Sequence, residues 1–171
     1  MKRRRSVSKL QFYEKRTIRL QNVLIGKADL DSEDEVNFEI LIEKMKTFIK
    51  VKGAVQVGPL IQYTRTFTNK NGEADMEISF MLQCNKGIHS VEKPFSFRPL
   101  LRVVDCLYCR YIGPEEHMKY AHDKIDLEAF ESGIELGNEC YMIYVDRDEE
   151  KETVVTDVFV PRLEKGRIQH E

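Results

Sequence analysis

Two glycines that lie 80 positions apart constrain the fold of this chain more than any other feature of its sequence. Gly53 and Gly133 each end a segment with helical character, and a pair of strand-like segments follows each of them. Matching elements at a fixed offset are typical of an internal repeat. The sequence therefore predicts two copies of a β-α-β-β unit.

Both predicted helices carry start and stop signals. Ser32 and Glu35 have the spacing of a capping box, and Gly53 ends the helix that follows. In the second helix Pro114 precedes acidic residues, which the N-terminal end of a helix favours, and Gly133 supplies the stop. In the first helix, apolar residues recur at steps of three and four: Phe38, Leu41, Ile42, Met45, Phe48 and Ile49.

Segments rich in β-branched and aromatic residues predict the strands. They are residues 17–28, 57–68 and 76–83 in the first unit, with a hairpin turn at 69–72, and residues 100–112, 139–146 and 153–160 in the second. Each unit exposes one sheet face and one helix stripe that only the other unit can cover. We therefore expect one α+β domain over residues 17–163, with repeats at about 17–84 and 98–163, a basic tail at 1–16 and a C-terminal tail at 164–171.

The composition is that of a globular chain with no membrane span. Apolar residues make up 42% of the chain and charged residues 33%, which is far from the pattern of disorder. The longest apolar stretch, residues 140–145, is much shorter than the roughly 20 residues that a spanning helix needs. Residues 1–5 resemble the start of a signal peptide, but residues 6–19 stay polar where an apolar region should follow. We expect a cytoplasmic protein.

The charge is distributed unevenly along the chain. The first twenty residues carry eight of the 27 Lys and Arg residues but one of the 29 acids, so the rest has 19 basic and 28 acidic residues. An acidic body lacks the electrostatic footprint of a nucleic-acid-binding domain. We expect only weak, salt-sensitive DNA contact through Lys2–Arg5, with no sequence preference and no membrane association.

Cysteine and histidine spacing offers neither a metal site nor a nucleophile. Cys106 and Cys109 have a Cys-x-x-Cys spacing, but residues three apart on a strand point to opposite faces. His117 and His122 lie five apart on a predicted helix, which is not the i, i+4 pair that a metal requires. No glycine-rich phosphate loop or Gly-x-Ser-x-Gly elbow occurs. We expect no metal, no cofactor and no catalysis.

Aromatic and basic residues on the predicted strands are the candidate ligand contacts. Alternation along a strand puts Tyr63 and Arg65 on one face, and the same holds for Tyr108 with Arg110 and for Met142 with Tyr144. Such a face could stack a planar ligand and hydrogen-bond its edge. The alternative is that these residues only cover the exposed side of a two-layer sheet. The candidate ligand-binding residues are thus Tyr63, Arg65, Tyr108, Arg110, Met142 and Tyr144.

Four strings in the second unit carry a family resemblance: Cys109–Glu116, Gly133–Gly137, Tyr141–Asp146 and Asp157–Pro161. In this order they resemble the second half of the GyrI-like effector-binding family, a small-molecule module found alone or attached to bacterial transcription activators. The resemblance extends from about Ile18 to Pro161 when the first unit is included. The chain also resembles a group of Firmicutes proteins built on this module.

The resemblance implies a curved antiparallel sheet with both helices on one side and a cleft for flat, hydrophobic and often cationic compounds. Two positions depart from the family pattern. Met142 stands where a glutamate usually precedes the strand tyrosine, here Tyr144, and Glu115 stands where an aromatic residue commonly follows Gly-Pro. Because methionine offers no charge to a cation, we expect flat ligands that are neutral or weakly polar.

Three functions are compatible with these features. The first is a stand-alone, non-catalytic small-molecule-binding module, since residues 1–17 are too short for a helix-turn-helix. The second is a protein-interaction module, as the gyrase-inhibitor branch of the family implies. The third, single-stranded nucleic-acid binding on tyrosine and arginine, fits poorly with the acidic body. An open apolar cleft favours the first function, and a cleft filled by its own side chains favours the second.

Overall fold

The chain folds into alternating strands and helices in this computed structural model, which describes residues 7–31 and 37–163. The elements are β1 (Lys9–Lys27), α1 (Phe38–Val51), β2 (Gln56–Thr68), β3 (Ala74–Cys84), β4 (Phe95–Pro114), a 3₁₀ turn (Glu115–His117), α2 (Tyr120–Ser132), β5 (Glu139–Asp148) and β6 (Thr153–Pro161). The predicted α+β class is confirmed. The order β-α-β-β occurs twice, but duplication of one unit stays a prediction.

Several boundaries differ from those expected. β1 begins at Lys9, so residues 9–16 lie in the sheet and not in a basic tail. Asn37 caps α1, since its side chain accepts a hydrogen bond from the Ile40 amide at 3.1 Å. Ser32 and Glu35 of the expected capping box lie outside the described residues, as do Lys2–Arg5 and residues 164–171.

The second helix begins later than expected. Pro114 ends β4, and the 3₁₀ turn at Glu115–His117 separates that proline from α2. Gly133 ends α2 as predicted, with a φ of 65° that glycine adopts without the strain a side chain would add. Neither of the two helices in the described part of the chain is long and apolar enough to cross a membrane.

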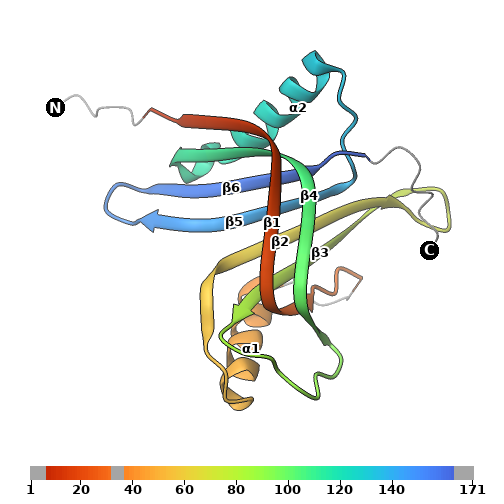
Figure 1. The fold of residues 1–171 in the computed structure, drawn as a ribbon, viewed down its shortest axis with the longest axis vertical. Helices are drawn as coiled ribbons and strands as arrows, with labels where there is room; N and C mark the ends of the chain where they lie inside the picture. Colours follow the sequence, from red (N-terminus) through yellow and green to blue (C-terminus); the bar gives the residue numbers. More distant parts are fainter. Residues whose placement is uncertain (1–6, 32–36, 164–171) are drawn as a thin grey trace.

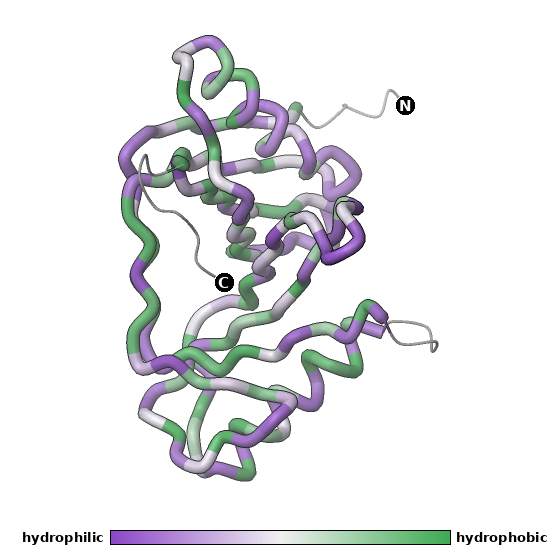
Figure 2. The backbone as a smooth tube through the Cα atoms, turned by 90° about the vertical axis from the view of Figure 1, so that its right-hand side faces the viewer, coloured by the Kyte–Doolittle hydropathy of each residue, from purple (hydrophilic) through white to green (hydrophobic). Residues whose placement is uncertain are grey.

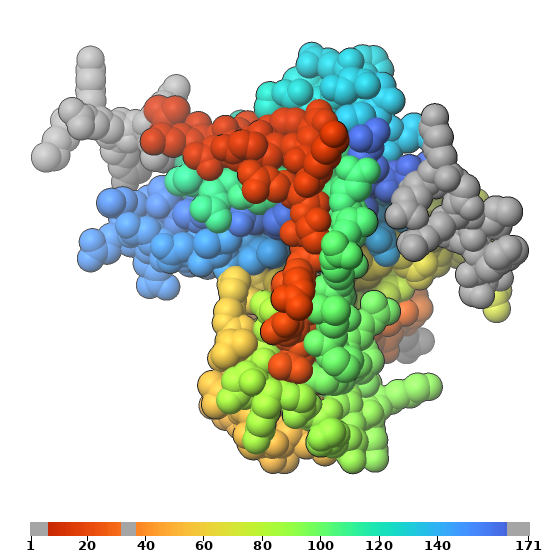
Figure 3. All heavy atoms as spheres, viewed as in Figure 1, coloured from red at the N-terminus to blue at the C-terminus, as the bar shows by residue number. Residues whose placement is uncertain are grey.

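The strands form one antiparallel sheet that closes on itself. In the described residues the six strands follow the order β1-β3-β2-β5-β6-β4, and β4 pairs again with β1. β1 and β4 run side by side along the long axis of the molecule, with α1 near one end and α2 near the other (Figure 1). Their atoms form two adjacent columns in the middle of the face in Figure 3.

Bulges bend these two long strands. Lys15, Asn22 and Asp105 have φ values of 55°, 51° and 56°, and the β1–β4 register shifts near Lys15. Bulges of this kind bend a strand, increase its twist and reverse the order of the faces on which side chains lie. β4 takes β6 as a strand partner only from Cys106 onward. Residues 98–104 therefore keep one strand edge without a partner strand in the described structure.

Strand register shows that both helices cover the same face of the sheet. One row of directly paired residues runs across six strands: Phe80, Gln62, Met142, Val158, Cys109 and Phe12. Directly paired residues project from one face. Phe80 belongs to the cluster under α1, and Val158 and Cys109 belong to the cluster under α2. The other face is therefore free of helices in the described structure.

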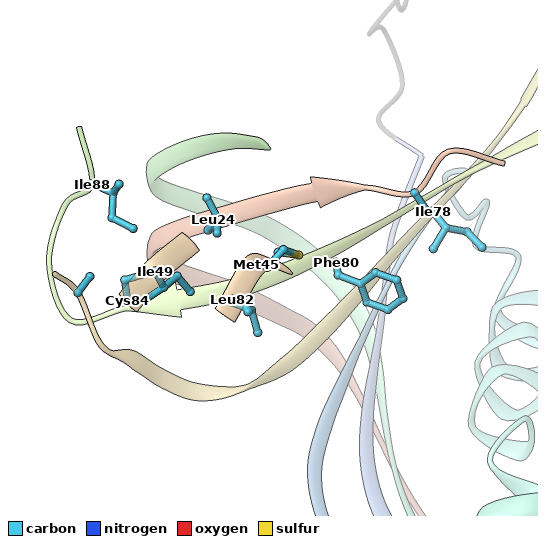
Figure 4. Close-up of a cluster of buried hydrophobic side chains, with 10 residues drawn as sticks. Leu24, Met45, Ile49, Ile78, Phe80, Leu82, Cys84 and Ile88 are labelled. Atoms are coloured by element: carbon cyan, nitrogen blue, oxygen red, sulfur yellow. The ribbon is translucent and has the colours of Figure 1, made fainter. Parts of the chain in front are cut away.

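The cluster under α1 depends on close contact between the helix and β1. Figure 4 shows Met45 and Ile49 of α1 beside Leu24 and Leu82, and all four side chains are almost fully buried. Gly26 makes this approach possible, because a Cβ atom there would lie 2.6 Å from Met45 Sδ. Hydrophobic and hydrophilic residues alternate along the strands (Figure 2), as expected for a sheet whose two faces meet different surroundings.

Candidate ligand-binding site

A row of aromatic side chains crosses the helix-free face of the sheet. Tyr13, Tyr108, Phe159, Tyr141 and Tyr63 are successive register partners on β1, β4, β6, β5 and β2. The ring centroids of Tyr108 and Phe159 lie 4.8 Å apart, those of Tyr63 and Tyr141 lie 5.0 Å apart, and those of Tyr13 and Tyr108 lie 6.1 Å apart. These spacings are typical of favourable aromatic contacts. We call these five residues the aromatic row.

Polar partners fix the row at two points. The Tyr63 hydroxyl donates to Glu139 Oε1 at 2.7 Å, and the Tyr108 hydroxyl donates to Asp157 Oδ1 at 2.8 Å. Arg110 holds the Asp157 carboxylate in a two-point contact, with Nε and Nη2 at 2.8 and 2.9 Å from its two oxygens. These charge-assisted bonds satisfy Asp157, which is only 8% exposed.

Burial controls the ionisation of these tyrosines. Burial, followed by the hydrogen bond to Asp157, raises the pKa of Tyr108 to about 12. Burial also raises the pKa of Tyr63 well above its usual value, and its hydrogen bond to Glu139 acts in the same direction. Both hydroxyls are therefore neutral donors at physiological pH.

A pocket of about 740 Å³ opens between Tyr141 of the aromatic row and residues 98–104 of β4. Part of its wall belongs to residues 98–104, a segment of β4 that has no partner strand along one edge in the described structure. The rest of the wall belongs to residues 136–141 and 161–163. Val103 and Leu136 supply apolar surface, Glu139 a carboxylate, and Tyr141 an aromatic ring. A concave surface of this size with a few polar groups is typical of small-molecule sites.

Tyr141 is the residue of the aromatic row that lines this pocket. Its side chain is 5% exposed, and its ring packs against Tyr63. Among the described residues its hydroxyl has no hydrogen-bond partner, and it is not one of their fully buried polar atoms, so the oxygen stays accessible from outside. A ligand in the pocket could supply that partner.

Four of the six predicted site residues lie on the helix-free face and two on the other face, and none of the six is in the described lining of the pocket. Tyr63, Arg65, Tyr108 and Arg110 project from the face of the aromatic row, where Arg65 Nη2 is held 2.9 Å from Glu77 Oε2. Met142 and Tyr144 project from the helix-covered face: Met142 packs in the cluster under α2, and the Tyr144 hydroxyl donates to Gln62 at 3.0 Å.

Sequence reasoning missed Tyr141 and Glu139, which take the places expected of Tyr144 and Met142. Alternation alone shows that Met142 and Tyr144 share a face but not which face it is. The register Tyr63↔Tyr141 decides this, and a shift of one residue would exchange the two sets. Glu139 stands two residues before Tyr141, so the sequence held a glutamate-tyrosine pair at the spacing that the resemblance implies.

Burial favours the neutral forms of the cysteines and of His122. Burial raises the pKa of Cys106 and of Cys140 to about 12 and that of Cys109 to about 11. Burial also lowers the pKa of His122, which lies 3.8 Å from Cys140 Sγ. The register places Cys106 and Cys109 on opposite faces of β4. Within residues 7–31 and 37–163, no cluster of His, Cys, Asp and Glu could hold a metal ion.

Comparison with known proteins identifies the fold but not the family. No family model and no curated protein sequence matches the chain. Among solved structures, the crystal structure of the EcmrR C-terminal domain is 15% identical, with a TM-score of 0.58 over 94% of this chain and 99% of that domain. The cryo-EM structure of the EcmrR–DNA complex in EcmrR-RPo is 14% identical, with a TM-score of 0.57 over 94% of this chain.

This chain spans 58% of the EcmrR chain in that DNA complex. At such low identity the likeness shows a shared fold alone, and it agrees with the α+β class expected from the sequence. Membership of the GyrI-like family stays a prediction.

Proposed function

We propose that this chain is a non-catalytic small-molecule-binding domain whose ligand lies in the pocket beside Tyr141. The pocket combines apolar surface, an aromatic wall and a carboxylate. The chain shares the fold of the EcmrR C-terminal domain. The resemblance to the GyrI-like family supports the same function. The protonated, buried thiols support binding over catalysis, since the thiolate is the nucleophilic form.

The observation that carries the proposal is the environment of Tyr141. Its ring packs against Tyr63, the residue lines the pocket, and its hydroxyl has no partner among the described residues. That hydroxyl is not fully buried, so it is accessible as a donor. A flat ligand that stacks on the wall can accept a hydrogen bond from it, which contributes roughly 0.5–1.5 kcal/mol.

The position of Met142 changes the expected ligand. A preference for neutral ligands followed from placing Met142 in the cleft, and Met142 instead packs under α2. Glu139 lies in the pocket wall. Charge therefore contributes to recognition at this site.

Chemical-shift mapping by NMR tests the proposal with a flat neutral probe, 2-naphthalenemethanol. We expect shifts concentrated in residues 98–104 and 136–141. Tyr141→Phe should weaken binding about threefold to tenfold, because it removes one hydrogen bond of roughly 0.5–1.5 kcal/mol. Tyr144→Phe is the matched control, since it alters a β5 tyrosine on the other face and should leave the affinity unchanged. Equal losses in both variants, or shifts confined to other surfaces, would disprove the site.

The proposal extends to partners and location. The four free cysteines fit a reducing compartment, which supports the cytoplasm. We also propose that duplex DNA is bound only weakly and without sequence preference. No feature of the structural neighbours favours the protein-interaction alternative.

A further inference from the structure

The charge of the pocket is set mainly by arginine. Among the described residues, Arg98, Arg102 and Arg162 line the pocket, and Glu139 is the one acid in that part of the lining. Arg162 Nε lies 3.9 Å from Asp105 Oδ2, so its charge is partly balanced. Arg98 and Arg102 have no acidic partner within 4.0 Å among the described residues. The described lining therefore carries a net positive charge.

Arg98 is an exposed residue of the pocket lining that shares a sheet face with Tyr141. It is the register partner of Val23, which is fully buried in the cluster beneath the aromatic row. Directly paired residues project from one face, so the Arg98 side chain shares the helix-free face with Tyr141. The charge of Arg98 also reaches Tyr141: burial and Glu139 raise the pKa of that tyrosine, and Arg98 acts in the opposite direction.

The single acid of the lining is already engaged. Glu139 accepts the hydrogen bond of Tyr63 through Oε1, which satisfies part of its negative charge. Two residues of the lining, Arg98 and Tyr141, then have side-chain donors with no protein acceptor among the described residues. An oxyanion is the complementary acceptor, because guanidinium binds carboxylates through two parallel hydrogen bonds.

We propose that the pocket selects flat aromatic ligands that carry a carboxylate, with Arg98 and Tyr141 binding the carboxylate and the aromatic wall binding the ring. This inference rests on the proposed function, since it names the ligand class of the same pocket. Arg102 contributes positive charge at the pocket. Glu139 can accept a hydrogen bond from a donor group elsewhere on the ligand.

The test uses three naphthalene probes of one shape and different charge: 2-naphthoate, 2-naphthalenemethanol and 2-naphthylmethylammonium. Isothermal titration calorimetry measures the affinity of each for the full chain. We expect naphthoate to bind about tenfold to a hundredfold more tightly than the neutral probe, because hydrogen bonds to charged groups contribute roughly 1.5–3 kcal/mol. Tighter binding of the ammonium probe would show that Glu139 dominates and would overturn the inference.

Substitution of Arg98 separates the ligand class from the existence of the site. Arg98→Gln should remove the advantage of naphthoate and leave the neutral probe unchanged, while Arg98→Lys should keep part of it. Arg147→Gln is the control, because Arg147 pairs with Glu115 outside this pocket and its loss should change nothing. Binding of the neutral probe without preference for naphthoate would overturn this inference alone. Binding of none of the three probes would overturn both proposals.

Discussion

At the scale of single residues, burial sets the ionisation of the aromatic row and of the thiols behind it. Burial raises the pKa of Tyr108 from 10.0 to about 12 and that of Cys109 from 9.0 to about 11. These groups are neutral when protonated, so the folded state holds their protons more tightly than the unfolded state does. Their contribution to stability is full below pH 9 and is lost as the pH rises toward 12.

We therefore predict that the free energy of unfolding falls as the pH rises above 9. The unfolded state releases these protons first, which favours unfolding. Urea titrations at pH 7.5 and pH 10.5 measure the difference. Absorbance at 295 nm gives an independent check, since fewer than the seven tyrosines should ionise by pH 11 in the folded protein and all seven after unfolding. Equal stability at both pH values would contradict this explanation.

At the scale of elements, the sequence predicted the identity of helices and strands better than their ends and partners. Gly133 ends α2 as expected, because a left-handed terminus has a local signal. The start of β1 at Lys9 has no local signal in the sequence, because the charged residues of this segment are held in the sheet by pairing with the distant strand β4. Registers such as Tyr63↔Tyr141 depend on bulges and tertiary packing, so the sequence did not show that four of the predicted site residues lie on one face of the sheet and two on the other.

The contact between α1 and β1 gives a prediction at the same scale. Gly26→Ala places a methyl group 2.6 Å from Met45 Sδ, so the helix must shift or Met45 must move. Overpacking of this kind costs about 1–3 kcal/mol of stability. Gly87→Ala is the matched control, because a Cβ there meets no atom within 4 Å. Urea denaturation of both variants measures the difference, and equal effects would show that α1 does not pack closely on β1.

At the scale of the whole molecule, the two predicted units are joined by their longest strands. β1 belongs to the first unit and β4 to the second, yet they pair from Lys9↔Ile112 to Gly26↔Phe95. The cluster beneath the aromatic row draws on both units as well, with Ile61 and Met81 from one and Leu101 and Tyr141 from the other. The pocket thus exists only in the assembled sheet, since Arg98 and Tyr141, the two residues proposed to bind the ligand, need β1 and β2 of the first unit to hold their positions.

This arrangement predicts that neither unit folds alone. A fragment of residues 1–90 keeps α1 and its cluster but loses β4, the partner along most of β1, and β5, the partner of β2. We expect a poorly dispersed ¹H–¹⁵N NMR spectrum for this fragment and for residues 91–171. Mixing the two fragments should restore dispersed signals and binding of 2-naphthalenemethanol, because β1 can then pair with β4 and β2 with β5. A well-dispersed spectrum from residues 1–90 alone would show that the first unit is an independent domain, and the requirement for a jointly built sheet would be wrong.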